Sequence, residues 1–431
     1  MIGRALYDVG APDELAHWLA QHPHIVMLAA SSQLDTYLDT GAGALLQQGQ
    51  LLRIRRRDGV SDAMLRDLAS DTTFVEEARD GCLPDGGTID ALVRSLAIRE
   101  PLGTVRTVLT RNFTYWDKVQ GNLDEVVFTP IGNDATRVAA LLSGEIDVME
   151  PVPLQDVERI KTTAGYKVLQ GPELRTIFLG MDQKRDELLF SNVKGKNPFK
   201  DKRVRQAFYQ AIDTETIKSR VMRGAATPTA LMIAPAVRGF QPDMNKRAPY
   251  DVEAAKRLLA DAGYPNGFEV GMNCPNDRYV NDAAICQAVA ANLARIGVKI
   301  NLTAETKVSY FPKILRRDTS FYLLGWTPST TDAHDALYNL MASPTDKGQG
   351  QYNLGVYNNP KLDELALKVQ TETDKTKRGE MIREAFKLHQ DDFGHIPLHQ
   401  QALAWGYNAK VSLVQLPTNY LYFKWVTVKA K

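Results

Sequence analysis

This sequence has no long hydrophobic run, no excess of charge of either sign and few histidines. No stretch approaches the ~18 consecutive apolar residues of a membrane-spanning helix, so none is expected. The 52 basic and 51 acidic residues give a formal net charge of +1, which argues against nucleic acid or an acidic membrane surface as a partner. Residues 1–10 lack a basic segment followed by an apolar core, so no signal peptide is expected there.

Cysteine is scarce, with three residues at positions 82, 274 and 286. No second cysteine pair or histidine pair accompanies them, which excludes the usual spacing of a structural zinc site. Cys274 and Cys286 flank a short segment and form either a disulfide or two buried free thiols, with Cys82 left over. A disulfide between Cys274 and Cys286 would fit an oxidising compartment.

The signatures of common enzyme sites are also missing. The chain contains no Gly-x-Ser-x-Gly turn, no glycine-rich phosphate loop with lysine and no His-Glu-x-x-His helix. His334 and Asp335 could form a metal-binding pair, but the seven scattered histidines do not build a metal site around it, and His399 is interpreted as structural. We therefore predict a protein that is not an enzyme and that has no catalytic residue, cofactor or metal.

Length and periodicity indicate two or three domains with an α/β fold. The chain has 431 residues, and from about residue 101 predicted strands and helices alternate along it. Helical spacing of apolar residues, with an acidic residue at each start, predicts helices over residues 134–144, 201–212, 251–263 and 282–296. Strands are expected at residues 122–128 and 298–302.

Residues 1–100 follow a different pattern, which indicates an atypical α+β segment. Short helices are expected at residues 13–21 and 89–96, strands at residues 25–28 and 51–55, and a turn at residues 85–88.

Within this segment, residues 33–40 and 49–55 resemble the tunnel strands of CYTH-type triphosphate enzymes, as part of a CYTH-like fragment over about 13–58. Arg53 and Arg55 would share one face of a strand, as anion-binding side chains do. The opening Glu-x-Glu-x-Lys strand of that family is absent, so a half-buried strand with solvated arginines is the favoured interpretation. A triphosphate-binding or triphosphate-hydrolysing enzyme is kept as the alternative function.

The stretch from Phe321 to Ala336 combines an apolar strand, a Gly-Trp pair and a polar loop. Trp326 offers an aromatic face, and Asp332 follows it with a carboxylate. Together they suit a cationic, amino-bearing ligand, because an indole attracts cations and a carboxylate binds ammonium. The alternative is a buried core tryptophan followed by a solvated loop aspartate.

This stretch resembles the hinge strand of the family-5 extracellular solute-binding proteins, the peptide and nickel receptors of bacterial ABC importers. Ala333 stands where the Asp-Pro loop of the family has proline. Six further ordered motifs carry the resemblance over about residues 101–431: Arg111–Trp116, Leu142–Asp147, Asn197–Asp213, Ala262–Phe268, Tyr352–Tyr357 and Ile396–Gln400.

The resemblance implies a two-lobed fold of the type II periplasmic-binding-protein class, with a hinge. One lobe would comprise residues 101–179 and 326–431, and the other residues 180–325, with crossover strands near 174–180 and 323–326. Only about 100 residues precede the Arg111–Trp116 motif, where the family has roughly 200, so the first lobe would be incomplete.

The resemblance also assigns ligand contacts. Asp332 would hold the α-ammonium group of a peptide, and Arg278 would pair with its carboxylate, since a guanidinium donates two parallel hydrogen bonds. Trp326 and Tyr357 are candidates for the cleft wall or for the core. Asn353 would reach ligand backbone groups or organise a turn.

The predicted function is therefore capture of di-, tri- or oligopeptides for a membrane permease of the ABC type. By resemblance, the protein would be a periplasmic monomer without a nucleic-acid partner. Nickel chelates, haem, glutathione and oligosaccharides remain open as ligands, because a fold does not determine its ligand. A non-functional fusion or truncated receptor is a further alternative.

Overall fold

The computed structural model describes residues 107–429, together with the backbone of five strands that precede them. The strands predicted at residues 25–28 and 51–55 lie within two of these five, β1 and β3. The helices expected at residues 13–21 and 89–96, the turn at 85–88 and Cys82 lie outside the described residues. The chain divides into two compact units, residues 1–117 with 123–132, and residues 118–122 with 133–431.

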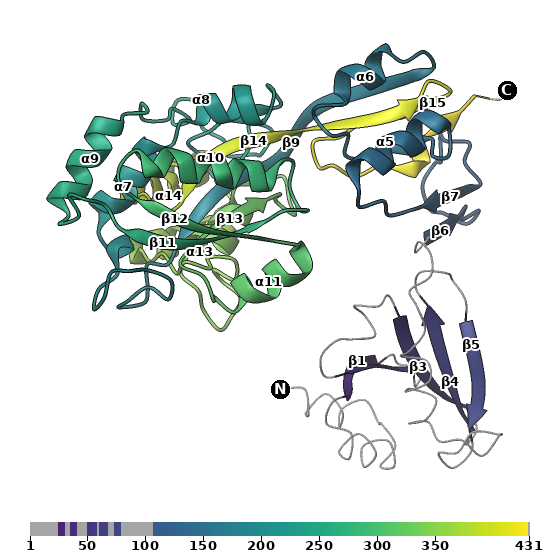
Figure 1. Cartoon of the computed structure of the whole chain (residues 1–431). Coiled ribbons are helices and arrows are strands. Elements are labelled where there is room, and N and C mark those ends of the chain that lie inside the picture. The colour runs from purple at the N-terminus through teal and green to yellow at the C-terminus, as the bar shows by residue number, and fades with distance from the viewer. Residues whose placement is uncertain are drawn as a thin grey trace. The chain divides into compact units, whose positions relative to one another are not determined.

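The first unit contains two antiparallel sheets among its described residues. One sheet places five strands side by side in sequence order, from β1 to β5 (Figure 1). The other is a hairpin in which Thr107 pairs with Phe128, and an ion pair joins Arg111 to Asp124 beyond its strand ends. The strands are β1 (Ile25–Ala30), β2 (Asp35–Thr40), β3 (Gln50–Arg57), β4 (Val60–Asp67), β5 (Thr73–Ala78), β6 (Thr107–Thr110) and β7 (Glu125–Phe128).

The second unit contains most of the described secondary structure. Its helices are α5 (Asp134–Ser143), α6 (Val157–Thr162), α7 (Lys202–Ala211), α8 (Thr214–Thr216), α9 (Val252–Asp261), α10 (Asp282–Ala294), α11 (Lys307–Leu315), α12 (His334–Ala336), α13 (Pro360–Thr371) and α14 (Lys375–Asp392). Its strands are β8 (Val148–Met149), β9 (Tyr166–Met181), β10 (Ala226–Pro228), β11 (Glu269–Pro275), β12 (Lys299–Glu305), β13 (Phe321–Trp326), β14 (Ile396–Asn408), β15 (Val411–Ser412) and β16 (Thr427–Val428).

Short-range capping explains where several helices begin and end. The Asn133 side chain accepts a hydrogen bond from the backbone of Thr136 at the start of α5, and Gly144 ends that helix at a φ of 80°. Asp201 and Asp251 cap α7 and α9 in the same way as Asn133 caps α5. The helices predicted from residues 134, 201, 251 and 282 are therefore confirmed.

A mixed seven-stranded sheet forms the centre of the second unit (Figure 1). Its order is β10-β14-β9-β13-β11-β12, with β8 paired to the far end of β14. The strands β11, β12 and β13 run parallel, whereas β9 lies antiparallel to both β13 and β14. Two long strands, β9 and β14, thus pair along most of their length.

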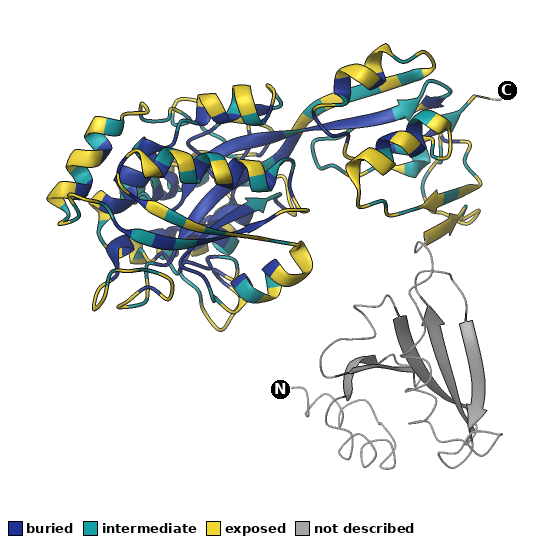
Figure 2. Ribbon diagram, viewed as in Figure 1, coloured by how far each residue is buried: buried dark blue, intermediate teal, exposed yellow. Residues whose placement is uncertain are grey.

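Alternating side chains of β9 and β13 divide the core between the two faces of this sheet. Ile177, Leu179 and Leu323 pack with α7, α9 and α10 on one face. Phe178 and Leu324 pack with α13 and α14 on the other. Successive strand residues point to opposite faces, so both faces are covered and β13 and the C-terminal half of β9 are mostly buried (Figure 2).

A third core lies at the outer ends of the two long strands. There α5 and α6 pack on β14 around Leu141, Ile160 and Ala404. The strands that run from this core into the main sheet are β9 and β14, whereas β13 ends at Trp326 within the main sheet. Residues on both sides of position 326 share one core, so the expected boundary at 326 does not separate two cores.

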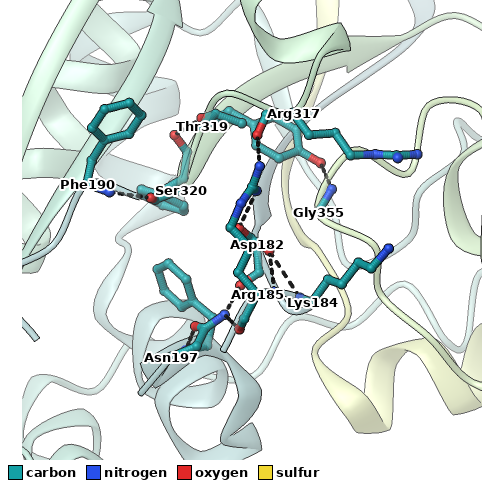
Figure 3. Close-up of polar contacts among 12 residues, drawn as sticks. Asp182, Lys184, Arg185, Phe190, Asn197, Arg317, Thr319, Ser320 and Gly355 are labelled. Carbon is teal, nitrogen blue, oxygen red and sulfur yellow. Dashed lines mark hydrogen bonds and ion pairs between the residues drawn. The ribbon is translucent and has the colours of Figure 1, made fainter. Parts of the chain in front are cut away.

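A partly buried polar network joins the end of β9 to the start of β13 (Figure 3). The Asp182 carboxylate binds the Arg185 guanidinium at 2.6 Å, and Arg185 also donates to the carbonyl oxygen of Arg317 at 2.8 Å. The Asn197 amide donates to the carbonyl oxygens of Asp182 and Arg185. This network lies at the opposite end of β13 from Trp326, because Met181 pairs with Phe321.

A disulfide joins Cys274 on β11 to Cys286 on α10. Both residues are fully buried in the core between α10 and the sheet. Among the helices that the structure describes, none combines the length and the apolar character that crossing a bilayer requires.

Candidate functional site

The candidate site lies where β13 ends and β9 and β14 leave the main sheet. Trp326 pairs with Thr176 of β9, and the β9–β14 register shifts close by, between Gln400 and Ala402. The loop after β11 reaches the same place, because the Tyr279 hydroxyl donates to the carbonyl oxygen of Gly325 at 3.3 Å. The end of β13, the middle of the continuous strands β9 and β14, and one loop therefore meet here.

Tyr279 is the centre of this arrangement. Two guanidinium groups lie over its ring, with the Arg175 Cζ atom 5.5 Å and the Arg278 Cζ atom 5.2 Å from the ring centroid. Such distances suit cation–π attraction. Gly325 permits the contact, since a Cβ there would lie 2.7 Å from the Tyr279 ring. Burial raises the pKa of Tyr279, so its hydroxyl stays protonated and donates.

A buried carboxylate supports the arginine on β9. Glu173 is 2% exposed and binds the Arg175 guanidinium at 2.9 Å. Its other oxygen accepts from the Gln401 amide of β14 at 2.8 Å. Gln401 in turn accepts from the backbone of Val280, in the Tyr279 loop, at 3.0 Å. The network therefore ties both long strands to the loop that carries Arg278.

The sequence analysis missed Glu173, Arg175, Tyr279 and Gln401. One signal was available, because Glu173 and Arg175 stand two apart on a strand and so share a face. Opposite charges on one face of a strand that is otherwise apolar indicate a buried pair.

Arg278 is the exposed member of the site. The Asp282 carboxylate accepts from the backbone N–H groups of Arg278 and Tyr279, at 2.9 and 3.0 Å, and so shapes the loop. Burial raises the pKa of Asp282 despite these hydrogen bonds. The Arg278 guanidinium forms no ion pair with a described residue, so its donors can bind a ligand.

Asp332 does not present a free carboxylate. Arg378 of α14 binds both of its oxygens, at 2.8 and 3.0 Å, and the backbone of His334 donates to it at 2.9 Å. Burial alone would raise the pKa of Asp332, but the hydrogen bonds from Arg378 and His334 and the Arg378 charge lower it overall. In this structure the ammonium partner expected from a ligand is replaced by an internal guanidinium.

Trp326 is anchored from its polar edge. Its indole N–H donates to the Asp335 carboxylate at 2.7 Å, and Ser329 donates to the same carboxylate through its backbone at 3.1 Å and through its hydroxyl. The Trp326 ring lies against Tyr352, with centroids 4.8 Å apart. The half-buried indole therefore has a set orientation and can form one wall of a cleft.

Asn353 and Tyr357 lie in the interior together. Asn353 is fully buried, and its amide donates to the carbonyl oxygens of Ala342 and Tyr357. The Tyr357 hydroxyl donates to the Asp392 carboxylate at 2.8 Å. Burial, followed by the Asp392 charge, raises the pKa of Tyr357. The polar groups of both side chains therefore form hydrogen bonds within the protein.

The structure thus joins two of the predicted residues. Tyr279 links Arg278 to the strand end that carries Trp326, while Asp332, Asn353 and Tyr357 have internal partners. Among the described residues, no group of three or more histidine, cysteine or acidic side chains could hold a metal ion.

Comparison with known proteins identifies relatives. The family model of the bacterial extracellular solute-binding proteins, family 5 Middle, matches residues 102–348. Heme-binding protein A of Haemophilus influenzae is 27% identical over 326 residues, covering 74% of this chain and 56% of the relative. The glutathione-binding protein GsiB of Escherichia coli K12 is 26% identical over 275 residues, covering 61% of this chain and 50% of the relative. The chain spans about half the length of these relatives.

Solved structures show the same fold. The periplasmic binding protein DppA of Helicobacter pylori, in complex with the peptide STSA, has a TM-score of 0.66 at 23% identity, covering 75% of this chain and 60% of that one. The dipeptide-binding protein of a Pseudoalteromonas species, in complex with Met-Leu, has a TM-score of 0.65 at 22% identity, covering 75% and 62%.

These comparisons confirm the α/β fold of type II periplasmic binding proteins that the motifs predict. The resemblance of residues 13–58 to CYTH-type enzymes is not borne out. The relatives found are solute-binding proteins, and the family model begins at residue 102.

Proposed function

Because the chain belongs to family 5 of the bacterial extracellular solute-binding proteins, we propose that it captures short peptides for an ABC permease. The observation that carries this proposal is the exposed Arg278 beside Tyr279, whose hydroxyl reaches the end of the strand that carries Trp326, where the main sheet passes into the third core. A ligand would be enclosed there between two closing lobes, which is a usual place for a ligand in two-lobed binders.

The ligand is a peptide bound by its carboxylate end. Arg278 supplies a guanidinium that no described carboxylate neutralises, and a planar fork of donors matches a carboxylate. Trp326 supplies an oriented aromatic wall. Asp332 is left out of this contact set, because an ammonium group would have to displace Arg378.

Capture rather than catalysis is the role of the site. Binding energy would be spent on closure around the ligand, and a monomer would then dock onto its permease outside the cytoplasmic membrane. Two observations support this location: the family is described as extracellular, and the chain contains the buried Cys274–Cys286 disulfide, which suits an oxidising compartment.

The test is thermal unfolding of the chain with a mixed di- and tripeptide library, beside the same library amidated at its carboxyl ends. A ligand that binds only the folded state stabilises it by about 2.7 kcal/mol at 100 times its dissociation constant. We expect free-acid peptides to raise the midpoint and amidated peptides to raise it less.

The matched variants are Arg278→Gln and Arg257→Gln, the second replacing an exposed arginine on α9. Arg278→Gln should abolish the difference between free and amidated peptides, whereas Arg257→Gln should keep it. Equal shifts for both libraries in the parent would refute the carboxylate contact, and no shift with any peptide would refute peptide capture.

A further inference from the structure

A pocket of about 530 Å³ lies between α7, the C-terminal end of α14 and the loop of residues 243–248. It shares no lining residue with the candidate site. Its volume falls in the range of small-molecule sites, about 300–1,000 Å³.

The inner surface of the pocket is aromatic and uncharged. Tyr209 and Phe393 lie side by side in its wall, with ring centroids 5.3 Å apart. His389 and His395 line it as well, with ring nitrogens 2.9 Å apart. The Nε2 atom of His395 is buried and has no hydrogen-bond partner among the described residues. Burial and then the Arg205 charge lower the pKa of His389 to about 3, so this ring is neutral.

The rim of the pocket carries more positive than negative charge that is not held in an ion pair. Lys202 and Lys246 line the pocket, and neither forms an ion pair with a described residue. The two carboxylates of the rim are already neutralised, since Asp243 binds Arg383 and Asp391 binds Lys387. The ammonium groups of Lys202 and Lys246 are therefore not held in ion pairs by described residues, although the Lys246 charge helps to lower the pKa of the nearby Asp243 carboxyl.

Two arginines behind the walls add to this positive potential. The Arg247 guanidinium stacks on Tyr209 at 3.9 Å and donates to the carbonyl oxygens of Tyr209 and Pro397. Arg205 donates to the carbonyl oxygens of Phe199, Lys200 and Asp392.

Neither arginine forms an ion pair with a described carboxylate. Burial lowers the pKa of Arg205, and among the acidic groups Asp392 opposes that shift most strongly. Its carboxylate is held instead by the side chains of Tyr357 and Asn359.

We propose that this pocket binds a small organic anion, with its anionic group at Lys202 and Lys246 and its apolar body against Tyr209 and Phe393. Ammonium groups that are not held in ion pairs attract an anion, and the aromatic wall removes apolar ligand surface from water. This second site is independent of peptide capture, because it uses neither Arg278 nor Trp326.

The experiment is ligand-detected NMR with benzoate, using benzamide as a neutral compound of the same shape. We expect benzoate to bind at least about tenfold more tightly than benzamide, the scale of one charge-assisted contact. Equal binding of the two compounds, or no binding of benzoate, would overturn the proposal.

Three variants place benzoate in this pocket rather than elsewhere. Lys202→Gln with Lys246→Gln should weaken benzoate to the level of benzamide, and Gln206→Trp should weaken both compounds by filling the cavity from α7. The charge-matched control, Lys184→Gln with Lys347→Gln, should change neither.

Arg278→Gln should likewise leave benzoate binding unchanged. Benzoate binding that survives both pocket variants, or that depends on Arg278, would assign the compound to another site.

Discussion

Asp332 shows how a residue that the family resemblance assigns to a ligand can have an internal partner in the folded chain. Its carboxylate was expected to meet a ligand ammonium group, and it meets the guanidinium of Arg378, 46 residues along the chain. An ammonium group and a guanidinium group are both cations with several hydrogen-bond donors, and a carboxylate binds either of them. Which cation reaches it depends on how α14 packs beside the loop.

At this scale we predict that Asp332 contributes to stability through Arg378. A double-mutant cycle of Asp332→Asn and Arg378→Gln should give a coupling energy of about 1–2 kcal/mol in urea unfolding, because the pair is bidentate and mostly buried. The exposed pair Asp243 and Arg383 is the control, for which less than about 1 kcal/mol is expected. Additive effects of the two substitutions would contradict the role of the pair.

The pH dependence of that coupling has a defined sign. The pKa of Asp332 is lower in the folded chain than its ordinary value, so the folded state binds its proton less readily. The stabilisation is fully present above the unfolded pKa of about 3.9 and is lost as pH falls through the folded pKa.

At the scale of elements, sequence patterns located the helices well. Capping residues and helical periodicity are encoded within a few positions, which explains why α5, α7, α9 and α10 begin and end close to their predicted bounds. The length of β9 and β14 was not predicted. A strand that is buried on alternating faces by different partners carries no single local period that marks its end.

At this scale we predict that the disulfide between β11 and α10 stabilises the folded chain. Its cysteines are 12 residues apart, so loop-closure entropy gives a stabilisation of about 3 kcal/mol. Adding a phosphine reductant should lower the unfolding free energy of the parent by this amount. The Cys274→Ala with Cys286→Ala variant should start lower and should not respond. A parent that unfolds identically with and without reductant would show that the thiols are not joined.

At the scale of the whole molecule, both faces of one sheet are covered and several histidines become buried in the process. His389, His395 and His399 are each at most 2% exposed. Burial lowers the pKa of His399 to about 4 and lowers that of His395 as well, with a smaller contribution from His389. The folded chain therefore holds neutral rings that the unfolded chain would protonate below about pH 6.5.

We therefore predict that the protein loses stability as pH falls from about 6.5, since the unfolded state then binds more protons than the folded state. Each buried histidine contributes up to about 1.4 kcal/mol per pH unit. His399→Leu removes one of these groups at a site where neither ring nitrogen has a partner among the described residues. The unfolding free energy of this variant, measured in urea between pH 6.5 and 4.5, should fall less steeply with pH than that of the parent, by up to about 1.4 kcal/mol per pH unit. An unchanged slope would contradict the prediction.

The division into lobes also belongs to this scale. The predicted boundaries followed the order of motifs along the chain, whereas the cores are assembled from segments far apart in sequence. Leu324 and α14 share one core although the predicted boundary at residue 326 lies between them. The lobe assignment remains a prediction.

The sequence by itself determined the family and the α/β class, and it led to the proposal of Arg278 and Trp326 as ligand contacts, because motifs and periodicities are local properties of the chain. Only the tertiary structure decided that Asp332 is bound by Arg378, that Asn353 and Tyr357 are interior, and that Tyr279 and Arg175 stand beside Arg278. These outcomes depend on which distant segments bury one another. A charged or amide side chain in the interior takes whichever partner the packing brings within hydrogen-bond distance.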